Sequence, residues 1–148
     1  MRQERFEFAS AGERLTGNLF LPDGEPIGAA VTTGPLTSVK EQAAGVYARA
    51  MAERGYAALA FDHRGFGESG GEPRQFEDPQ GKAADIVAAV TALGVDPRTA
   101  ALPVFAVGVC AGGGYMAQAV ADDRRIAAFA GIAGVYPDAE QTRAWMGD

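Results

Sequence analysis

The chain has 148 residues and an apolar fraction of 47%, which suffices for one compact domain with a hydrophobic core and argues against disorder. Its net charge is −6 and its 13 basic residues are scattered, so the sequence has no basic stripe of the kind that nucleic-acid binding needs. The apolar runs fall short of the roughly 18 residues of a membrane span, and the N-terminus has no apolar region typical of a signal peptide.

The N-terminal segment predicts an antiparallel hairpin. Residues 5–8 alternate between charged and aromatic side chains, residues 10–13 have the composition of a turn, and residues 15–21 form the second strand. Pro22, Asp23 and Gly24 then close this unit.

Short apolar runs follow at residues 29–31, 57–61, 104–109 and 127–133. Runs that are apolar on both faces are typical of parallel strands that helices cover on each side. These runs therefore predict a mostly parallel sheet.

The first helix is expected after residue 38. Ser38 and Glu41 have the spacing of a capping box. An apolar stripe with helical periodicity follows, made of Ala43, Val46, Tyr47, Ala50 and Met51. Gly55 stands where a left-handed residue would end this helix.

Two further helices are expected. Asp78 and Pro79 have the pattern of an N-cap residue and a first helical residue, and Gly94 is expected to end that helix. A third helix should begin directly after Cys110 and end near residue 121. The order predicts an α/β fold of three layers (αβα), with a mostly parallel sheet and an antiparallel N-terminal hairpin, as one domain over residues 1–148.

The chemically informative segment surrounds Cys110. Gly108, Cys110 and Gly112 have the spacing of a nucleophile elbow between a strand and a helix, with cysteine in the place of serine. Side chains two residues before and after the nucleophile would collide in such a turn, so glycine is needed there. The helix N-terminus favours a thiolate beside it, and the Ala111 N–H points to where an oxyanion would form.

This segment also has other interpretations. A lone cysteine is more often a small buried hydrophobic residue than a nucleophile. A dinucleotide-binding fingerprint would need glycine in place of Cys110, and the phosphate loop of a nucleotide-binding domain is absent from the sequence.

Two further segments support the elbow. Residues 61–69 resemble the D-x-R-G-x-G-x-S loop of α/β-hydrolases, and residues 33–42 lie where that family carries its oxyanion loop. The chain thus resembles the N-terminal part of an α/β-hydrolase over nearly its whole length. The cysteine elbow and the 33–42 loop look most like dienelactone-hydrolase-like members.

The resemblance implies a hydrolase that cleaves an ester, lactone or thioester of a small molecule through a cysteine acyl-enzyme. Cys110 is then the nucleophile, and the backbone N–H groups of Ala111 and Leu36 are the oxyanion donors, because Pro35 has no N–H. No cofactor or metal is implied.

The resemblance also assigns the loop after the second parallel strand. Asp62 and Arg64 are expected to organise this loop, and His63 is expected to be structural, with the alternative that it is the general base. Family members carry the catalytic histidine and acid later in the fold, so this chain is expected to lack both, together with the C-terminal strands and helices.

Three interpretations follow: part of a larger hydrolase, a small protein that completes its site by dimerising, or a non-catalytic interaction domain. The 127–133 strand is apolar and uncharged, so we expect it to form an unprotected edge through which the chain could form a homo-oligomer. The alternative is that residues 139–145 fold back over this edge, with Trp145 covering it. The lone cysteine fits a reducing compartment, so a cytoplasmic protein is expected.

Overall fold

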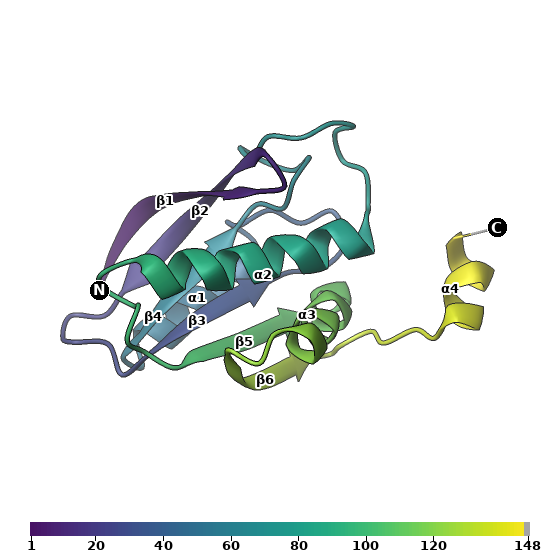
Figure 1. The fold of residues 1–148 in the computed structure, drawn as a ribbon. Coiled ribbons are helices and arrows are strands. Elements are labelled where there is room, and N and C mark those ends of the chain that lie inside the picture. The colour runs from purple at the N-terminus through teal and green to yellow at the C-terminus, as the bar shows by residue number, and fades with distance from the viewer. Residues whose placement is uncertain (147–148) are drawn as a thin grey trace.

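The computed structural model describes residues 1–146, and its chain begins with the hairpin. β1 (Arg2–Ser10) and β2 (Glu13–Leu21) pair antiparallel along their whole length. Ala11 and Gly12 form the turn between them, both at positive φ. The predicted hairpin is confirmed (Figure 1).

The remaining strands run parallel to one another, as the apolar runs predict. They are β3 (Gly28–Thr33), β4 (Tyr56–Phe61), β5 (Val104–Val109) and β6 (Ile126–Ile132). Within residues 1–146 the strands form one six-stranded sheet in the order β1-β2-β4-β3-β5-β6, in which β2 joins β4 antiparallel. The carboxyl ends of β3, β4 and β5 therefore meet at one edge, where ligands usually bind in open α/β sheets.

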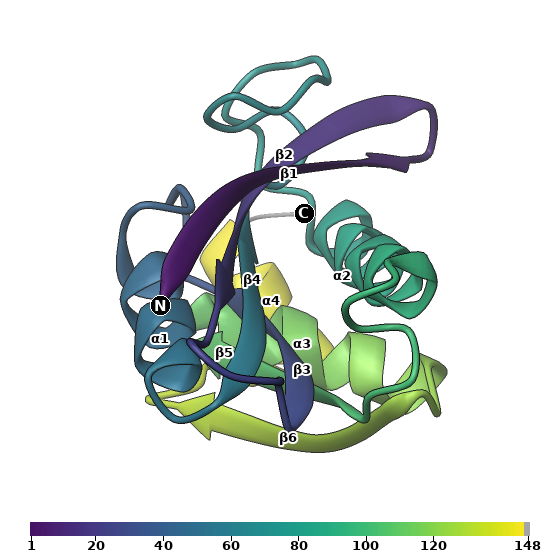
Figure 2. The same ribbon diagram turned by 90° about the vertical axis from the view of Figure 1, so that its left-hand side faces the viewer.

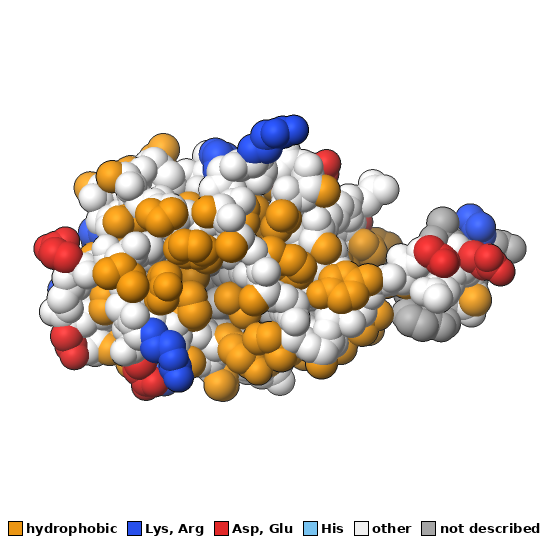
Figure 3. Space-filling view, turned by 90° about the horizontal axis from the view of Figure 1, so that it is seen from below, with side chains coloured by type: hydrophobic (Ala, Val, Ile, Leu, Met, Phe, Trp, Pro, Cys, Tyr) orange, Lys and Arg blue, Asp and Glu red, His pale blue; other side chains and the backbone are white. Residues whose placement is uncertain are grey.

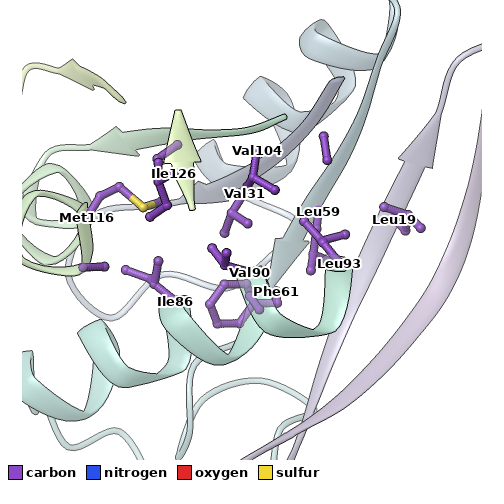
Figure 4. Close-up of a cluster of buried hydrophobic side chains, with 14 of the residues drawn as sticks. Leu19, Val31, Leu59, Phe61, Ile86, Val90, Leu93, Val104, Met116 and Ile126 are labelled. Atoms are coloured by element: carbon purple, nitrogen blue, oxygen red, sulfur yellow. The ribbon is translucent and has the colours of Figure 1, made fainter. Parts of the chain in front are cut away.

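Helices cover both faces of this sheet. α1 (Ala43–Ala52) packs on one face, and α2 (Pro79–Val95) and α3 (Ala111–Asp122) pack on the other (Figure 2). Neighbouring residues of a strand point to opposite faces. Val31 accordingly joins the core under α2 and α3, which Figure 4 shows, while Ala30 faces α1. The predicted three-layer architecture is confirmed.

The start of α1 differs from the sequence prediction. The helix begins at Ala43 after Gln42, and no side-chain hydrogen bond caps it. The Ser38 hydroxyl instead donates to the carbonyl oxygen of Pro35 at 2.7 Å, within the loop that precedes the helix. The capping box is therefore wrong, because the serine hydroxyl closes a local turn.

The buried face of α1 was also predicted wrongly. Val46, a member of the expected stripe, is 62% exposed, whereas Ala44 and Ala48 are buried. The sheet presents alanines to this helix, among them Ala30 and Ala58. The helix therefore approaches the sheet closely through its small residues and turns Val46 outward.

α2 starts at Pro79 with Asp78 before it, as predicted, but it does not end at Gly94. The helix continues to Val95, and Asp96 then turns to extended backbone (φ −70°, ψ 127°). Pro97 is the cause, because a residue before proline is disfavoured in the helical region.

The C-terminal part of the described chain leaves β6 uncovered at its outer edge. α4 (Ala139–Met146) stands apart from β6, beyond the carboxyl ends of the strands (Figure 1). The expectation that residues 139–145 cover the edge is thus not met by the backbone, and the Trp145 side chain lies outside the described residues. Ala127, Ala128 and Ala130 are exposed on β6, and Figure 3, seen from below, shows apolar side chains across this face. None of the described helices is long and apolar enough to cross a membrane.

Candidate active site

Cys110 occupies a strained turn between β5 and α3. Its backbone has φ 55° and ψ −123°, a left-handed conformation that residues other than glycine rarely adopt. Its N–H donates to the carbonyl oxygen of Ile132 at 3.0 Å, and its own carbonyl oxygen accepts from the N–H groups of Gly113 and Val135 at 2.9 and 3.1 Å. The end of β6 therefore helps to hold the turn, and the thiol is partly exposed.

Two glycines make this turn possible. A Cβ atom at Gly108 would lie 2.5 Å from the carbonyl oxygen of Gly112, and one at Gly112 would lie 2.4 Å from the carbonyl oxygen of Gly34. Both distances are far below a normal contact, and both neighbouring atoms belong to the backbone. The elbow thus packs directly against the loop after β3, and the Thr33 hydroxyl donates to the Gly112 carbonyl oxygen at 3.2 Å.

The structure brings Leu36 and Ala111 to one pocket. Ala111 is the first residue of α3, where a helix leaves backbone N–H groups without acceptors of its own. Leu36 lies in the loop after β3 and is 54% exposed. The pocket has a volume of about 450 Å³ and is lined by Leu36, Glu77, Pro79, Ala111, Gly114, Tyr115, Ala117, Gln118, Val135, Tyr136 and Pro137. Its walls are mainly apolar.

Asp62 anchors two loops at the carboxyl end of β4. Its buried carboxylate accepts hydrogen bonds from the Lys40 N–H at 2.8 Å, the Lys40 ammonium at 2.7 Å and the Glu68 N–H at 3.0 Å. Gly67 passes so close that a Cβ atom there would collide with this carboxylate. The loop after β3 and the loop after β4 are therefore joined through one side chain.

Lys40 forms a buried ion pair with Asp62 that the sequence did not indicate. Its side chain is 3% exposed and also pairs with Glu41 and Glu68. Burial lowers the pKa of the Lys40 ammonium, but the hydrogen bonds to Asp62, Glu41 and Glu68 outweigh burial and raise it overall. Hydrogen bonds from the Lys40 ammonium and from Arg5 lower the pKa of Glu68 to about 2.

Arg64 finds its acidic partner in Asp85 of α2. The Arg64 N–H, Nε and Nη2 all donate to the Asp85 carboxylate at 2.6–2.9 Å. Burial raises the pKa of Asp85, but the nearby His63 ring and the hydrogen bonds from Arg64 outweigh burial and lower this pKa to about 2. This pair ties the loop after β4 to α2.

His63 lies inside this loop. The residue is 6% exposed, its ring packs edge-on against Phe61 with centroids 4.7 Å apart, and Nδ1 lies 3.5 Å from Asp85 Oδ2. Within the described residues neither ring nitrogen has a hydrogen-bond partner of normal geometry. Burial lowers the pKa of the imidazole despite the Asp85 carboxylate. These contacts support the structural role expected for His63.

A second, partly buried ion pair between Glu77 and Lys82 borders the pocket, and the sequence did not predict it. The Glu77 carboxylate accepts from the Thr37 N–H at 2.6 Å, the Lys82 ammonium at 2.7 Å and the Tyr115 hydroxyl at 3.0 Å. Lys82 is 3% exposed and its ammonium lies 4.1 Å from the centre of the Phe66 ring. Charged residues at a helix start usually face water, so their spacing carried no signal of this pair.

The charges of this pair influence each other. Burial raises the pKa of Glu77, but hydrogen bonds from Lys82 and Thr37 outweigh burial and lower it. Burial also lowers the pKa of the Lys82 ammonium, more than the attraction of Glu77 raises it. Burial, the charge and hydrogen bond of Glu77, and a smaller electrostatic effect of Cys110 raise the pKa of the Tyr115 hydroxyl. Within the described residues no three His, Cys, Asp or Glu side chains are placed to hold a metal ion.

Comparison with known proteins agrees with the fold. Residues 29–147 match the family described as serine aminopeptidase, S33. The chain therefore belongs to this hydrolase family, within the α/β-hydrolase superfamily. The description of the family names serine, whereas the residue at position 110 of this chain is cysteine.

Individual relatives match over part of their length. Protein PA2218 of Pseudomonas aeruginosa is 41% identical over 120 residues, which are 79% of this chain and 32% of PA2218. Thiohydrolase aneE of Aspergillus aculeatus is 36% identical over 120 residues, 78% of this chain and 36% of that enzyme. The chain thus spans about a third of the length of these relatives.

Solved structures show the same architecture. The crystal structure of PA2218 gives a TM-score of 0.86 at 37% identity, covering 90% of this chain and 43% of that one. The α/β hydrolase GrgF from Penicillium gives a TM-score of 0.86 at 27% identity, covering 99% of this chain and 52% of that one. A dienelactone hydrolase from Anabaena variabilis, with a TM-score of 0.78 at 22% identity over 90% of this chain and 63% of that one, shares the fold.

Proposed function

We propose that this chain is the nucleophile-bearing part of a dienelactone-hydrolase-like enzyme that cleaves an ester, lactone or thioester through a cysteine acyl-enzyme. The observation that carries the proposal is the strained conformation of Cys110 at the first turn of α3, beside a pocket that Leu36 and Ala111 share. Strain of this kind, held by surrounding structure, clusters at active sites.

In this mechanism the Cys110 thiolate attacks the carbonyl carbon of the substrate. A C–S bond forms, and the carbonyl electrons move onto the oxygen, which the N–H groups of Ala111 and Leu36 stabilise. The oxyanion then collapses and expels the alcohol or thiol, which takes up a proton, and leaves an acyl thioester on Cys110. Water finally cleaves this thioester and restores the thiol.

The apolar walls of the pocket suit a hydrophobic acyl group of a small-molecule substrate. Asp62, Arg64 and the elbow glycines Gly108 and Gly112 act by shaping the loops around the nucleophile. Because the chain spans about a third of its relatives, we propose that the general base and acid belong to the remaining part of such proteins. A cytoplasmic location stays a prediction from the sequence.

The decisive experiment is intact-mass analysis after mixing the chain with p-nitrophenyl acetate and with an acyl thioester. The chain has one cysteine, so Cys110→Ala removes every thiol and is a clean control. We expect one acyl group on the wild-type chain and none on the Cys110→Ala variant. A wild-type chain that gains no acyl group at Cys110 would contradict the proposal.

The exposed β6 edge favours a second candidate, a small interaction domain that pairs with a copy of itself or completes its site in a dimer. Ala127, Ala128 and Ala130 leave this edge without the charges that usually protect one. Self-association without acylation of Cys110 would support this candidate over the hydrolase.

A further inference from the structure

Glu77 connects three parts of the molecule that surround the pocket. Its carboxylate accepts hydrogen bonds from Thr37 in the loop after β3, from Lys82 in α2 and from Tyr115 in α3. The side chain is only 14% exposed. Glu77 also lines the pocket together with Leu36 and Ala111, the candidate oxyanion donors.

The bond to Thr37 fixes the backbone next to Leu36. Thr37 has φ 55°, a left-handed conformation that a β-branched residue rarely adopts and that needs support from its surroundings. The support is a hydrogen bond of 2.6 Å from the Thr37 N–H to an ionised carboxylate, which is among the stronger kinds in proteins. Only the φ and ψ angles of Leu36 separate this peptide group from the Leu36 N–H. Fixing the Leu36–Thr37 peptide therefore restricts the direction of the Leu36 N–H.

The hydrogen bond from Tyr115 joins Glu77 to α3, the helix that carries Ala111. Tyr115 lies one helical turn after Ala111, on the same face of α3, since residues four apart are neighbours on a helix. The Tyr115 hydroxyl donates to Glu77 Oε2 at 3.0 Å. The carboxylate thus links the loop that carries one candidate donor to the helix that carries the other.

Lys82 keeps this carboxylate ionised and in place. Its ammonium is buried between Glu77 and the Phe66 ring, where an isolated charge would be costly. The pair therefore holds Glu77 in one position, and Glu77 in turn holds the loop.

We propose that Glu77 is a positioning residue for the oxyanion site: its carboxylate holds the Leu36–Thr37 peptide against α3, so that the Leu36 and Ala111 N–H groups point to the same place beside Cys110. This inference rests on the proposed function. It adds a role for a residue that touches neither the nucleophile nor the reacting carbonyl.

Two reactions of the same sulfur atom test the proposal. Alkylation by iodoacetamide displaces iodide and forms no oxyanion, whereas acylation by p-nitrophenyl acetate passes through one. Loss of one oxyanion donor lowers such rates by about 10²–10³-fold. We expect Glu77→Ala to slow acylation of Cys110 at least about 10-fold while alkylation changes by less than about 3-fold, because only acylation needs the aligned donors.

Further variants separate positioning from folding. Glu77→Gln keeps an oxygen that can accept from Thr37 and should recover most of the acylation rate. Glu77→Ala leaves Lys82 buried without its partner, so the double variant Glu77→Ala, Lys82→Met is included to remove both charges and should show the same selective loss. Glu25→Ala, at an exposed carboxylate between β2 and β3, is the matched control and should change neither rate.

The outcomes distinguish this inference from the proposed function. A wild-type chain that is alkylated but never acylated overturns both. Acylation that is as fast in Glu77→Ala and in the double variant as in the wild type overturns the positioning role alone. A parallel fall of alkylation and acylation in both variants also overturns it, since it would show a general structural effect.

Discussion

Replacing Gly112 by alanine tests how tightly the elbow packs against the loop after β3. The new Cβ atom would lie 2.4 Å from the carbonyl oxygen of Gly34, 2.8 Å from Thr33 Oγ1 and 2.9 Å from the carbonyl oxygen of Thr33. Two of these atoms belong to the backbone and cannot rotate away. An extra methyl group in a packed site costs about 1–3 kcal/mol. The backbone contacts place Gly112→Ala at the upper end, so we expect the free energy of unfolding to fall by about 3 kcal/mol.

The matched control is Gly94→Ala on the exposed side of α2, where a Cβ atom would meet nothing within 4 Å. Alanine is favoured over glycine inside a helix by roughly 0.5–1 kcal/mol, so this variant should be more stable than the wild type. Urea unfolding followed by circular dichroism measures both changes, provided that the denaturant slopes agree. If Gly112→Ala were as stable as the wild type, the close packing of elbow and loop would be refuted.

Four further predictions concern pH, reactivity, turnover and assembly. Burial lowers the pKa of His63 in the folded chain, so the unfolded chain binds more protons below about pH 6.5 and stability falls as the pH drops, with a slope of up to about 1.4 kcal/mol per pH unit. His63 is the single histidine, so His63→Asn should flatten the slope in urea titrations between about pH 5 and 6.5, and an unchanged slope would contradict this account. Cys110 directly precedes α3, and cysteines at helix N-termini are often reactive, so Cys110 should react with iodoacetamide faster than glutathione does at about pH 7; a slower rate would argue against activation. Ester hydrolysis by the 148-residue chain should stop at a stoichiometric burst, because deacylation needs a base that is worth about 10²–10⁴-fold; sustained turnover that Cys110→Ala abolishes would disprove this. Finally, we propose that the β6 edge self-associates, so Ala128→Lys should shift the chain toward monomer in sedimentation at micromolar concentration, whereas a monomeric wild type would exclude pairing through this edge.

Most of the fold could be predicted because its signals are local. Strands such as β5 and β4 are continuous apolar runs, and the proline at the start of α2 marks its first residue. The orientation of α1 could not be predicted in this way. Its buried face is decided by the alanines that the sheet presents, and helical periodicity alone favoured the larger residues such as Val46.

The candidate site was likewise predictable only where its sequence signal is local. The Cys110 turn could be predicted, because Gly108 and Gly112 are needed within a few residues of it. Lys40 and Glu77 could not, because each is buried only when a loop folds over it from a distant part of the chain. A charged residue in a sequence suggests exposure unless its partner is known, and here the partners are Asp62 and Lys82.

The hydrogen bonds at the Cys110 turn draw on one short stretch of the chain. The backbone of Cys110 bonds to Gly113, Ile132 and Val135, which all follow it closely in the chain. The most distant of these partners is Val135, so every backbone hydrogen bond of the turn is made within residues 110–135. In a longer protein, residues after Val135 would therefore not be needed for these bonds, and the turn would keep its backbone support whatever follows.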